Sequence, residues 1–230
     1  MKLPRDFTNV FNWILDNLIP PIIRDSRLLV KPFFWLIFKN KGNYFLNFKD
    51  KVIGLGHNEL IDYYKKTSAA HIQRETDLNK KSIAFILNNI VGDSVLDISC
   101  GRGYLSKKIV EELSIEVTGV DFIIDSELKN SKNPLFLEGS IENIPYPDKH
   151  FDTVISTHTL EHVKDIHQAI RELRRVCKKR LIIVVPKQRE YKYTFDLHVH
   201  FFPYKHSILK LMQNKKGACL CLSQDWLYYE

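Results

Sequence analysis

The sequence predicts an α/β fold in which a mostly parallel sheet is covered by helices on both faces. Short apolar strands alternate with amphipathic helices after residue 77, and the first strand leads through a glycine-containing turn directly into a helix. The 230 residues are 44% hydrophobic and 27% charged with nine Gly and nine Pro, which excludes disordered, collagen-like and disulfide-scaffold classes. The length allows one globular domain with a modest extension.

The elements of this domain follow in a regular order. The domain, 77–230, opens with a helix over 77–90 for which Thr76 is the expected N-cap. We then expect strands over 94–98, 116–120, 135–137, 153–156 and 181–185, and helices over 104–113, 160–177 and 206–212. Two short strands over 218–222 and 226–229, joined by a Ser-Gln-Asp turn, predict an antiparallel hairpin at the sheet edge.

Residues 1–51 predict a basic, aromatic helical extension, followed by a linker with a short helix over 52–76. The extension holds nine Lys or Arg against four Asp or Glu, and therefore +5 of the formal net charge of +7. Apolar residues recur at helical spacing from Phe7 to Leu18, and a cluster from Phe33 to Phe38 is flanked by basic residues. This mixture indicates either an element that rests on a membrane or a lid whose apolar face covers the main domain.

Two features bear on location. The longest apolar stretch, Leu28 to Phe38, contains a Lys-Pro pair and is far shorter than the ~20 residues of a spanning helix, and no secretory signal is visible. The four cysteines lack paired metal-ligand spacing and fit a reducing compartment. We expect a cytoplasmic protein, with the inner face of the membrane as an alternative location.

The turn after the first strand carries the clearest functional signal. The strand reads SVLDI and the turn reads SCGRG, and glycine lets backbone amides approach a ligand closely. If Gly101 and Gly103 are the first two glycines of a dinucleotide fingerprint, Ser106 stands at its third small position, where it fits poorly. A Walker loop would need Gly-Lys-Ser/Thr, which this turn lacks. Asp97 disfavours an anion at this turn, whereas Asp121 after the second strand can accept hydrogen bonds from a ribose diol. The expected ligand is a nucleoside with a positive, phosphate-free tail.

The segments VLDISCGRG, GVD, GSIENIPYPDKHFD and LEHV, in this order, resemble the class I S-adenosylmethionine-dependent methyltransferases of the type 11-like kind, over about residues 74–229. The resemblance implies a Rossmann-like, seven-stranded, mostly parallel sheet with a terminal antiparallel hairpin, and S-adenosyl-L-methionine as cofactor. It implies that the amino-acid part of the cofactor lies against Asp97 and the turn of Ser99, Cys100, Gly101 and Gly103, the ribose on Asp121, the adenine between Phe122 and Ser140-Ile141, and the methionyl end near Thr157.

This sequence departs from the family pattern at two positions. Ser99 replaces the first motif glycine, and Ser140 replaces the acidic residue that often faces the adenine amino group. A serine in a tight turn crowds the ligand, whereas Ser140 can still accept a hydrogen bond. We therefore expect weaker cofactor binding that is not abolished.

Candidate acid-base groups follow the fourth strand. His158, Glu161 and His162 would share one face if this turn were helical, which is an acid-base or metal-binding arrangement. We expect His158, rather than His162, to act as a base, and a structural role behind the cofactor is the alternative for His162. Some quinone-pathway O-methyltransferases carry a metal-binding carboxylate where His158 stands, so we assign no metal.

The loop over 186–203 lies where substrates bind in open α/β sheets, at the carboxyl ends of the strands. The side chains that could contact an acceptor are Tyr191, Tyr193, Asp196, His198 and His200. If the segment is extended, the last three lie on one side, either in an acceptor site or as a hydrogen-bonded anchor of the loop.

The predicted function is transfer of a methyl group from S-adenosylmethionine to a small-molecule, lipid-linked or glycan acceptor, with oxygen as the favoured acceptor atom. RNA methylation is one alternative, but residues 52–230 carry only +2 and the segment STHT lacks the Asp/Asn-Pro-Pro-aromatic sequence typical of nucleic-acid amino methyltransferases. Nucleic acid is therefore not an expected partner. The other alternative is a non-catalytic, peripheral membrane protein that retains the fold.

Overall fold

The computed structural model describes residues 10, 13–68, 75–193 and 195–230. The chain divides into two compact units, one of residues 1–74 with 188–201, called here the N-terminal unit, and one of residues 75–187 with 202–230, called the sheet unit. The boundaries expected near residues 51 and 76 remain predictions.

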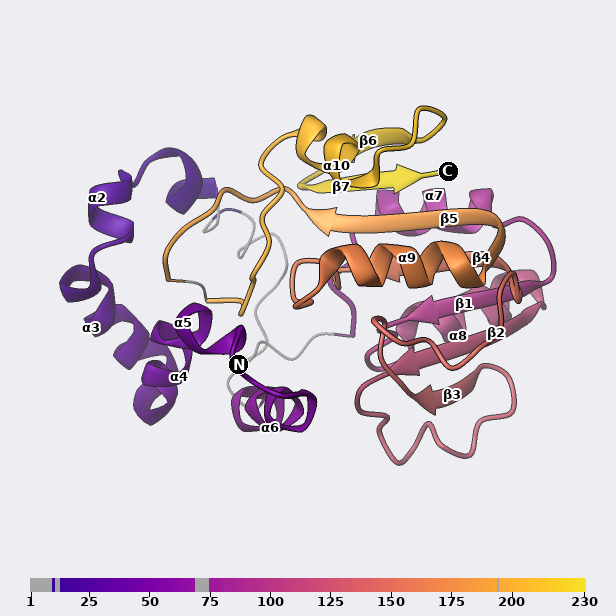
Figure 1. Cartoon of the computed structure of the whole chain (residues 1–230), viewed down its shortest axis with the longest axis horizontal. Coiled ribbons are helices and arrows are strands. Elements are labelled where there is room, and N and C mark those ends of the chain that lie inside the picture. Colours follow the sequence, from indigo (N-terminus) through magenta and orange to yellow (C-terminus); the bar gives the residue numbers. More distant parts are fainter. Residues whose placement is uncertain (1–9, 11–12, 69–74, 194) are drawn as a thin grey trace. The chain divides into compact units, whose positions relative to one another are not determined.

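Within the described residues, the sheet unit contains one seven-stranded sheet in the order β3-β2-β1-β4-β5-β7-β6 (Figure 1). Neighbouring strands run parallel from β3 to β5, whereas β7 is antiparallel to both β5 and β6. This confirms the predicted Rossmann-like sheet with its terminal hairpin. The strands are β1 (Ser94–Ile98), β2 (Glu116–Asp121), β3 (Leu135–Glu138), β4 (Phe151–Thr157), β5 (Cys177–Pro186), β6 (Ala218–Leu222) and β7 (Asp225–Tyr229).

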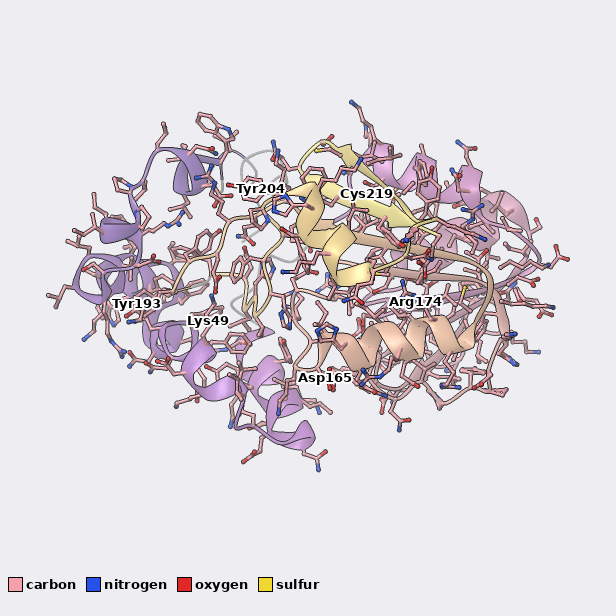
Figure 2. All side chains as sticks on the ribbon, turned by 45° about the horizontal axis from the view of Figure 1, so that its top comes forward. Lys49, Asp165, Arg174, Tyr193, Tyr204 and Cys219 are labelled. Carbon is pink, nitrogen blue, oxygen red and sulfur yellow. The ribbon has the colours of Figure 1, made fainter. Side chains whose placement is uncertain are left out.

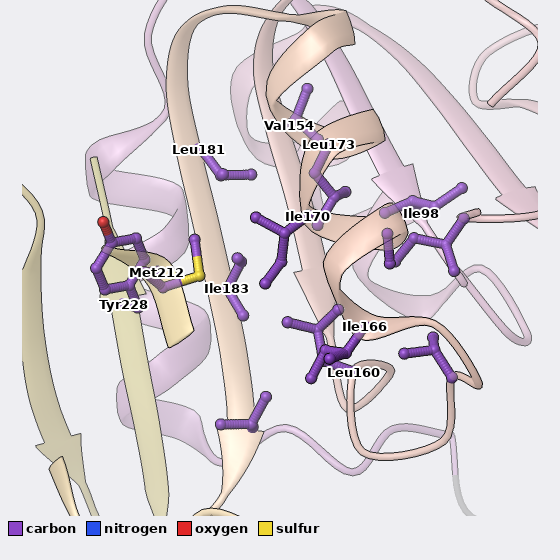
Figure 3. Close-up of a cluster of buried hydrophobic side chains, with 14 of the residues drawn as sticks. Ile98, Val154, Leu160, Ile166, Ile170, Leu173, Leu181, Ile183, Met212 and Tyr228 are labelled. Carbon is purple, nitrogen blue, oxygen red and sulfur yellow. The ribbon is translucent and has the colours of Figure 1, made fainter. Parts of the chain in front are cut away.

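Helices cover both faces of this sheet. Helices α9 (Ile166–Val176) and α10 (Lys205–Met212) pack on one face, and α7 (Lys80–Asn89) and α8 (Tyr104–Leu113) pack on the other (Figure 1). Because strand side chains alternate, Leu181 and Ile183 of β5 contribute to the α9 layer while Ile182 contributes to the α7 and α8 layer. Figure 3 shows the first layer, in which Ile170 and Leu173 of α9 lie beside β5. Burial on both faces explains the continuous apolar runs of the strands.

The start of α7 differs from the prediction. The helix begins at Lys80 because the side chain of Asn79 accepts a 2.9 Å hydrogen bond from the backbone N–H of Ser82. The expected cap, Thr76, instead accepts a 3.1 Å bond from the N–H of Leu78 in the turn before the helix.

The start of α9 also differs, and here the difference affects the site. Residues 160–162 form a turn, and the helix begins at Ile166 because Asp165 caps it with a 2.9 Å bond from the N–H of Gln168. Figure 2 marks Asp165 at this end of α9 and Arg174 in its last turn. The expected start of this helix at residue 160 is therefore wrong, the condition that residues 158–162 form a helical turn is not met, and β5 is longer than expected because it begins at Cys177.

The N-terminal unit is built of short helices. Its core consists mainly of aromatic side chains, with Phe34, Phe45 and Phe48 fully buried and Tyr193 and Leu197 joining from the 188–201 segment. Residues 13–17 are helical, and the rest of the helix expected from Phe7 lies mostly outside the described residues. No helix in the described ranges is long and apolar enough to cross a membrane. The helices are α2 (Pro21–Arg24), α3 (Arg27–Phe38), the 3-10 helix η1 (Lys39–Lys41), α4 (Gly42–Leu46), α5 (Phe48–Val52) and α6 (His57–Ser68).

Candidate functional site

The turn between β1 and α8 has a left-handed backbone at three of its five residues. Ser99, Gly101 and Gly103 have φ angles of 61°, 54° and 71°. The N–H groups of Ser99 and Cys100 both donate to the carbonyl of Val120, at 2.6 and 3.1 Å, which closes the turn against the end of β2. A left-handed conformation costs a serine about 1–2 kcal/mol. The replacement of the family glycine at Ser99 therefore leaves the turn intact at a modest cost in stability.

The two glycines of the turn serve different purposes. A Cβ on Gly103 would lie 2.5 Å from Cζ of Phe136. The packing of Phe136 against the start of α8 therefore requires a residue without a side chain at this position. A Cβ on Gly101 would meet no protein atom within 4 Å. The turn therefore presents open space beside Gly101, which a bound ligand can approach closely.

Two carboxylates stand at the carboxyl ends of the adjacent strands β1 and β2. Asp97 is 1% exposed, and its Oδ2 accepts a 2.6 Å hydrogen bond from the hydroxyl of Ser106. Burial raises the pKa of Asp97 to about 6, the Ser106 bond opposes this rise, and the charge of Asp121 adds to it. Burial also raises the pKa of Asp121, although this carboxylate accepts the N–H of Gly101 at 2.8 Å. The pair makes this end of the sheet favourable for a cation.

The segment after β3 lies along α9. Ser140 accepts the N–H of Glu142 at 3.1 Å, Ile141 is buried, and Glu142 in turn accepts the N–H groups of Lys164 and Asp165 at 3.1 and 2.8 Å. Glu142 therefore connects the expected adenine segment to the start of α9. Phe122, the other expected adenine contact, is partly exposed just after β2.

A second connection holds the continuation of this segment. The guanidinium of Arg175 donates to the carbonyls of Ile144 and Tyr146 at 2.9 and 2.7 Å, and Glu172 accepts the N–H of Ile144 at 2.8 Å. Arg175 and Glu172 also bond each other at 2.8 Å. Sequence reasoning missed Ser106, Glu142, Glu172 and Arg175. The i, i+3 spacing of the last two predicts a helix-surface pair but does not indicate the loop that they hold.

His158 follows β4 with a left-handed φ of 50°, and its N–H donates to the carbonyl of Val184 at 2.8 Å. Its Nδ1 lies 3.4 Å from Oε1 of Glu161, and its Nε2 lies 3.7 Å from Oδ2 of Asp225. Burial favours the neutral imidazole, but the two carboxylates outweigh it and raise the pKa to about 10. The two carboxylates therefore favour the protonated imidazole, which disfavours the predicted role of His158 as a base.

Asp225 connects this histidine to a helix start. Its Oδ2 also accepts a 2.7 Å hydrogen bond from Nδ2 of Asn79, the residue that caps α7. The network joins the end of β4, the start of β7 and the N-terminus of α7, three places that are far apart in the sequence.

The remaining candidates lie at the end of β4 and in the turn that follows it. Thr157 ends β4, and its carbonyl accepts a 3.1 Å bond from the hydroxyl of Thr159. His162 is partly buried, and its backbone N–H donates to the carbonyl of Thr159 at 2.9 Å. The structure places Thr157 and His158 at the carboxyl end of β4, on the same sheet edge as Asp97 and Asp121.

The predicted acceptor residues all lie in the N-terminal unit. Tyr191 is buried against Gln188, whose side chain is a hydrogen-bond partner, and burial raises the pKa of Tyr191. Tyr193 is part of the aromatic core, and the carbonyl of Tyr191 accepts a 2.6 Å bond from Lys49 (Figure 2).

The rest of this loop is not extended. His198 is buried with Nδ1 2.6 Å from Oε1 of Gln188, and Leu197 has a φ of 56°, which breaks the expected alternation of Asp196, His198 and His200. Within its own unit, the loop is held by hydrogen bonds and aromatic packing, which agrees with the alternative that these residues anchor the loop. Contact of these residues with an acceptor remains a prediction.

Part of the sheet unit is similar in sequence to known methyltransferases. Residues 96–185 match the family described as a methyltransferase domain. The demethylmenaquinone methyltransferase of Listeria monocytogenes is 33% identical over 100 residues, covering 38% of this chain and 41% of that protein. The norajmaline N-methyltransferase of Rauvolfia serpentina is 26% identical over 144 residues, covering 58% and 49%. The chain thus spans less than half the length of these curated relatives.

Solved structures support the fold alone. A crystal structure titled as an S-adenosylmethionine-dependent methyltransferase from Thermotoga maritima aligns with a TM-score of 0.50 and 17% identity. The alignment covers 85% of this chain and 98% of that one.

Proposed function

We propose that this chain is a class I S-adenosylmethionine-dependent methyltransferase that transfers a methyl group to a small-molecule acceptor, which the match of residues 96–185 to the methyltransferase-domain family supports. The observation that carries the proposal is the pair of carboxylates, Asp97 and Asp121, that flank the open side of Gly101 at the sheet edge. A phosphate-binding site would place cationic or amide groups there instead of two acids, of which Asp97 is buried and Asp121 partly buried.

These residues fit the cofactor part by part. S-adenosylmethionine, when bound, supplies a methyl group on a positively charged sulfur. The buried carboxylate of Asp97 would hold the ammonium group of the amino-acid part, and Asp121 would accept the ribose hydroxyls. The space beside Gly101 lets the turn amides approach the ligand, and Ile141 and Phe122 would enclose the adenine.

The chain's contribution to catalysis is then mainly positioning. Methyl transfer is an in-line displacement, so holding the acceptor atom near the methyl group and collinear with the departing sulfur supplies most of the acceleration. Thr157 ends β4 on this edge and would lie near the methionyl end. Both ring nitrogens of His158 face the carboxylates of Glu161 and Asp225, so we assign His158 to positioning the end of β4 rather than to proton transfer.

The acceptor is proposed at a coarser level. We favour an oxygen atom of a small molecule, a lipid-linked molecule or a glycan, acted on in the cytoplasm or at the inner membrane face. One relative is named for demethylmenaquinone, which supports a small organic acceptor, and another is named as an N-methyltransferase, so the acceptor atom needs its own measurement.

The test is calorimetric titration with S-adenosylhomocysteine, the demethylated cofactor. We expect micromolar binding that weakens at least about tenfold in Asp121→Ala, which corresponds to the loss of hydrogen bonds to a charged group. The matched control, Glu127→Ala, removes an exposed carboxylate from the neighbouring loop and should bind like the wild type. Equal affinity in Asp121→Ala would show that the site is assigned to the wrong residues. Transfer of a labelled methyl group to a lipid extract, a small-molecule extract or RNA then identifies the acceptor class.

A further inference from the structure

Helix α3 of the N-terminal unit is apolar on both of its sides. Its inward side buries Phe34 and Phe38 in the aromatic core, where the Phe38 and Phe45 rings stack with centroids 3.8 Å apart. Its outward side leaves six large apolar side chains at least half exposed to solvent: Leu28, Leu29, Phe33, Trp35, Leu36 and Ile37. An ordinary surface helix would present polar residues there. We call these six side chains the α3 face.

Positive charge predominates on and around α3, where Asp25, one residue before the N-cap, is the nearest acidic residue in the sequence. Residues 26–49 contain five Lys or Arg and no Asp or Glu. Lys31 is exposed on α3 itself, and Lys39 and Lys41 follow at its end. Arg27 donates to the amide oxygen of Asn47 at 2.8 Å and Lys41 donates to a backbone carbonyl at 2.6 Å, so these bonds leave both charges uncompensated. The apolar surface is therefore bordered by positive charge.

We propose that the α3 face is a docking surface for a lipid bilayer that contains anionic lipids. Exposed Trp, Phe and Leu with Lys and Arg at the border is the composition of helices that lie in the interface plane, with the apolar side at the acyl boundary and the cations at the headgroups. A helix of 12 residues is about 18 Å long, which suits such an in-plane position. Membrane docking itself does not depend on the proposed function. Only its benefit does, because docking would bring the enzyme to a lipid-linked acceptor.

The contacts of α3 distinguish this occupant from the others. Phe34 and Phe38 already anchor α3 in the core of its own unit. The apolar side chains on its outward side are therefore not needed for that packing. A second copy of the chain would bring the same positive border against itself, which is electrostatically unfavourable. An anionic bilayer instead complements both the apolar surface and its charge.

The experiment is co-sedimentation of the whole chain with vesicles of phosphatidylcholine alone or mixed with phosphatidylglycerol. We expect partition into the anionic vesicles that weakens with salt and falls at least about tenfold in the double variant Trp35→Glu, Leu36→Glu. The variant Lys31→Gln, Lys39→Gln should lose about fivefold per charge on anionic vesicles only. Ile53→Glu is the matched control, because Ile53 is 79% exposed in the same unit but outside the α3 face.

Three results would overturn the proposal. They are absence of binding to anionic vesicles, equal binding by the Trp35→Glu, Leu36→Glu variant, and a concentration-dependent dimer in light scattering that this variant abolishes while vesicles bind no protein. Titration of the same variants with S-adenosylhomocysteine separates this proposal from the proposed function. Lost docking with intact titration refutes only the α3 face, and lost wild-type titration with intact docking refutes only the methyltransferase proposal.

Discussion

The hydroxyl of Ser106, in the first turn of α8, donates a 2.6 Å hydrogen bond to Oδ2 of Asp97 at the end of β1. Both side chains are fully buried, so a helix turn directly stabilises the carboxylate that we assign to the cofactor ammonium group. Without this bond, burial alone would raise the pKa of Asp97 further. The ionised form of the buried Asp97 carboxyl is therefore unfavourable until a cation binds it.

Asp97→Asn should stabilise the apo protein above pH 6 while it weakens cofactor binding. The folded-state pKa of about 6 is above the ordinary value of 3.8, so wild-type stability falls as pH rises from about 4 through 6, by up to about 3 kcal/mol. The variant lacks this fall. Urea unfolding at pH 5 and pH 8 measures the difference.

The matched control is Asp125→Asn, an exposed carboxylate that should give the wild-type pH dependence. Wild-type affinity for S-adenosylhomocysteine should also weaken as pH drops below 6, because Asp97 must lose its proton to hold the ammonium group. A variant that is less stable than the wild type at pH 8, or that binds as tightly, contradicts this assignment.

Alanine at the two turn glycines should separate binding from folding. Gly101→Ala has room for its Cβ and should cost about 1–2 kcal/mol of stability for its positive φ. The new methyl group would occupy the space assigned to the cofactor and lower its affinity at least about tenfold. Gly103→Ala should cost more, about 2–5 kcal/mol, because its Cβ would also overlap Phe136.

Thermal melts and titrations of both variants make the comparison. If Gly101→Ala binds S-adenosylhomocysteine like the wild type, the open space beside this residue is not part of the cofactor site. Equal melting of the two variants would contradict the packing role of Gly103.

His158→Gln should lower stability at pH 7 by about 3–5 kcal/mol, because it leaves the buried carboxylates of Asp225 and Glu161 without their cation. The folded-state pKa is about 10 against an ordinary 6.5, so the stabilisation is complete below 6.5 and is lost as pH rises through 10. The free energy of unfolding, measured with urea from pH 6 to pH 10, should thus fall more steeply for the wild type than for the variant. His167→Gln, on the exposed side of α9, is the control and should keep the wild-type slope.

The same substitution tests the predicted role as base. If turnover by the wild type rises with an apparent pKa near 7 and His158→Gln abolishes that rise, the imidazole is neutral and catalytic, in contradiction to the geometry.

Arg175→Met should release the segment that follows Ile141. The guanidinium donates to two backbone carbonyls of this segment, and its removal leaves buried Glu172 without its partner. We expect a loss of about 2–4 kcal/mol in stability and weaker binding of adenosine. Arg171→Met is the control, since among the described contacts Arg171 bonds only the partly buried side chain of Gln168 on the same helix and no backbone carbonyl of the segment. Unchanged adenosine affinity in Arg175→Met would remove the segment from the adenine site.

Local patterns were sufficient to predict most of the sheet unit. The strand 94–98, the helix 104–113 and the hairpin strand 218–222 have the expected bounds, because alternation and helical spacing are properties of neighbouring residues. Helix starts were less predictable: Thr76 and Asn79 are both suitable caps, and only packing selects Asn79, whose amide also reaches Asp225.

The sequence by itself determined the fold class, the glycine turn and the two strand-end carboxylates, because each depends on residues within a few positions of one another. Only the tertiary structure decided that Ser106 bonds Asp97, that Arg175 holds the loop after Ile141, and that His158 lies between the carboxylates of Glu161 and Asp225. Insertion of β7 between β5 and β6 brings Asp225 to the end of β4, and no local pattern contains that strand order. Protonation states in the site follow from such long-range contacts, since burial and neighbouring charges set the pKa of each group.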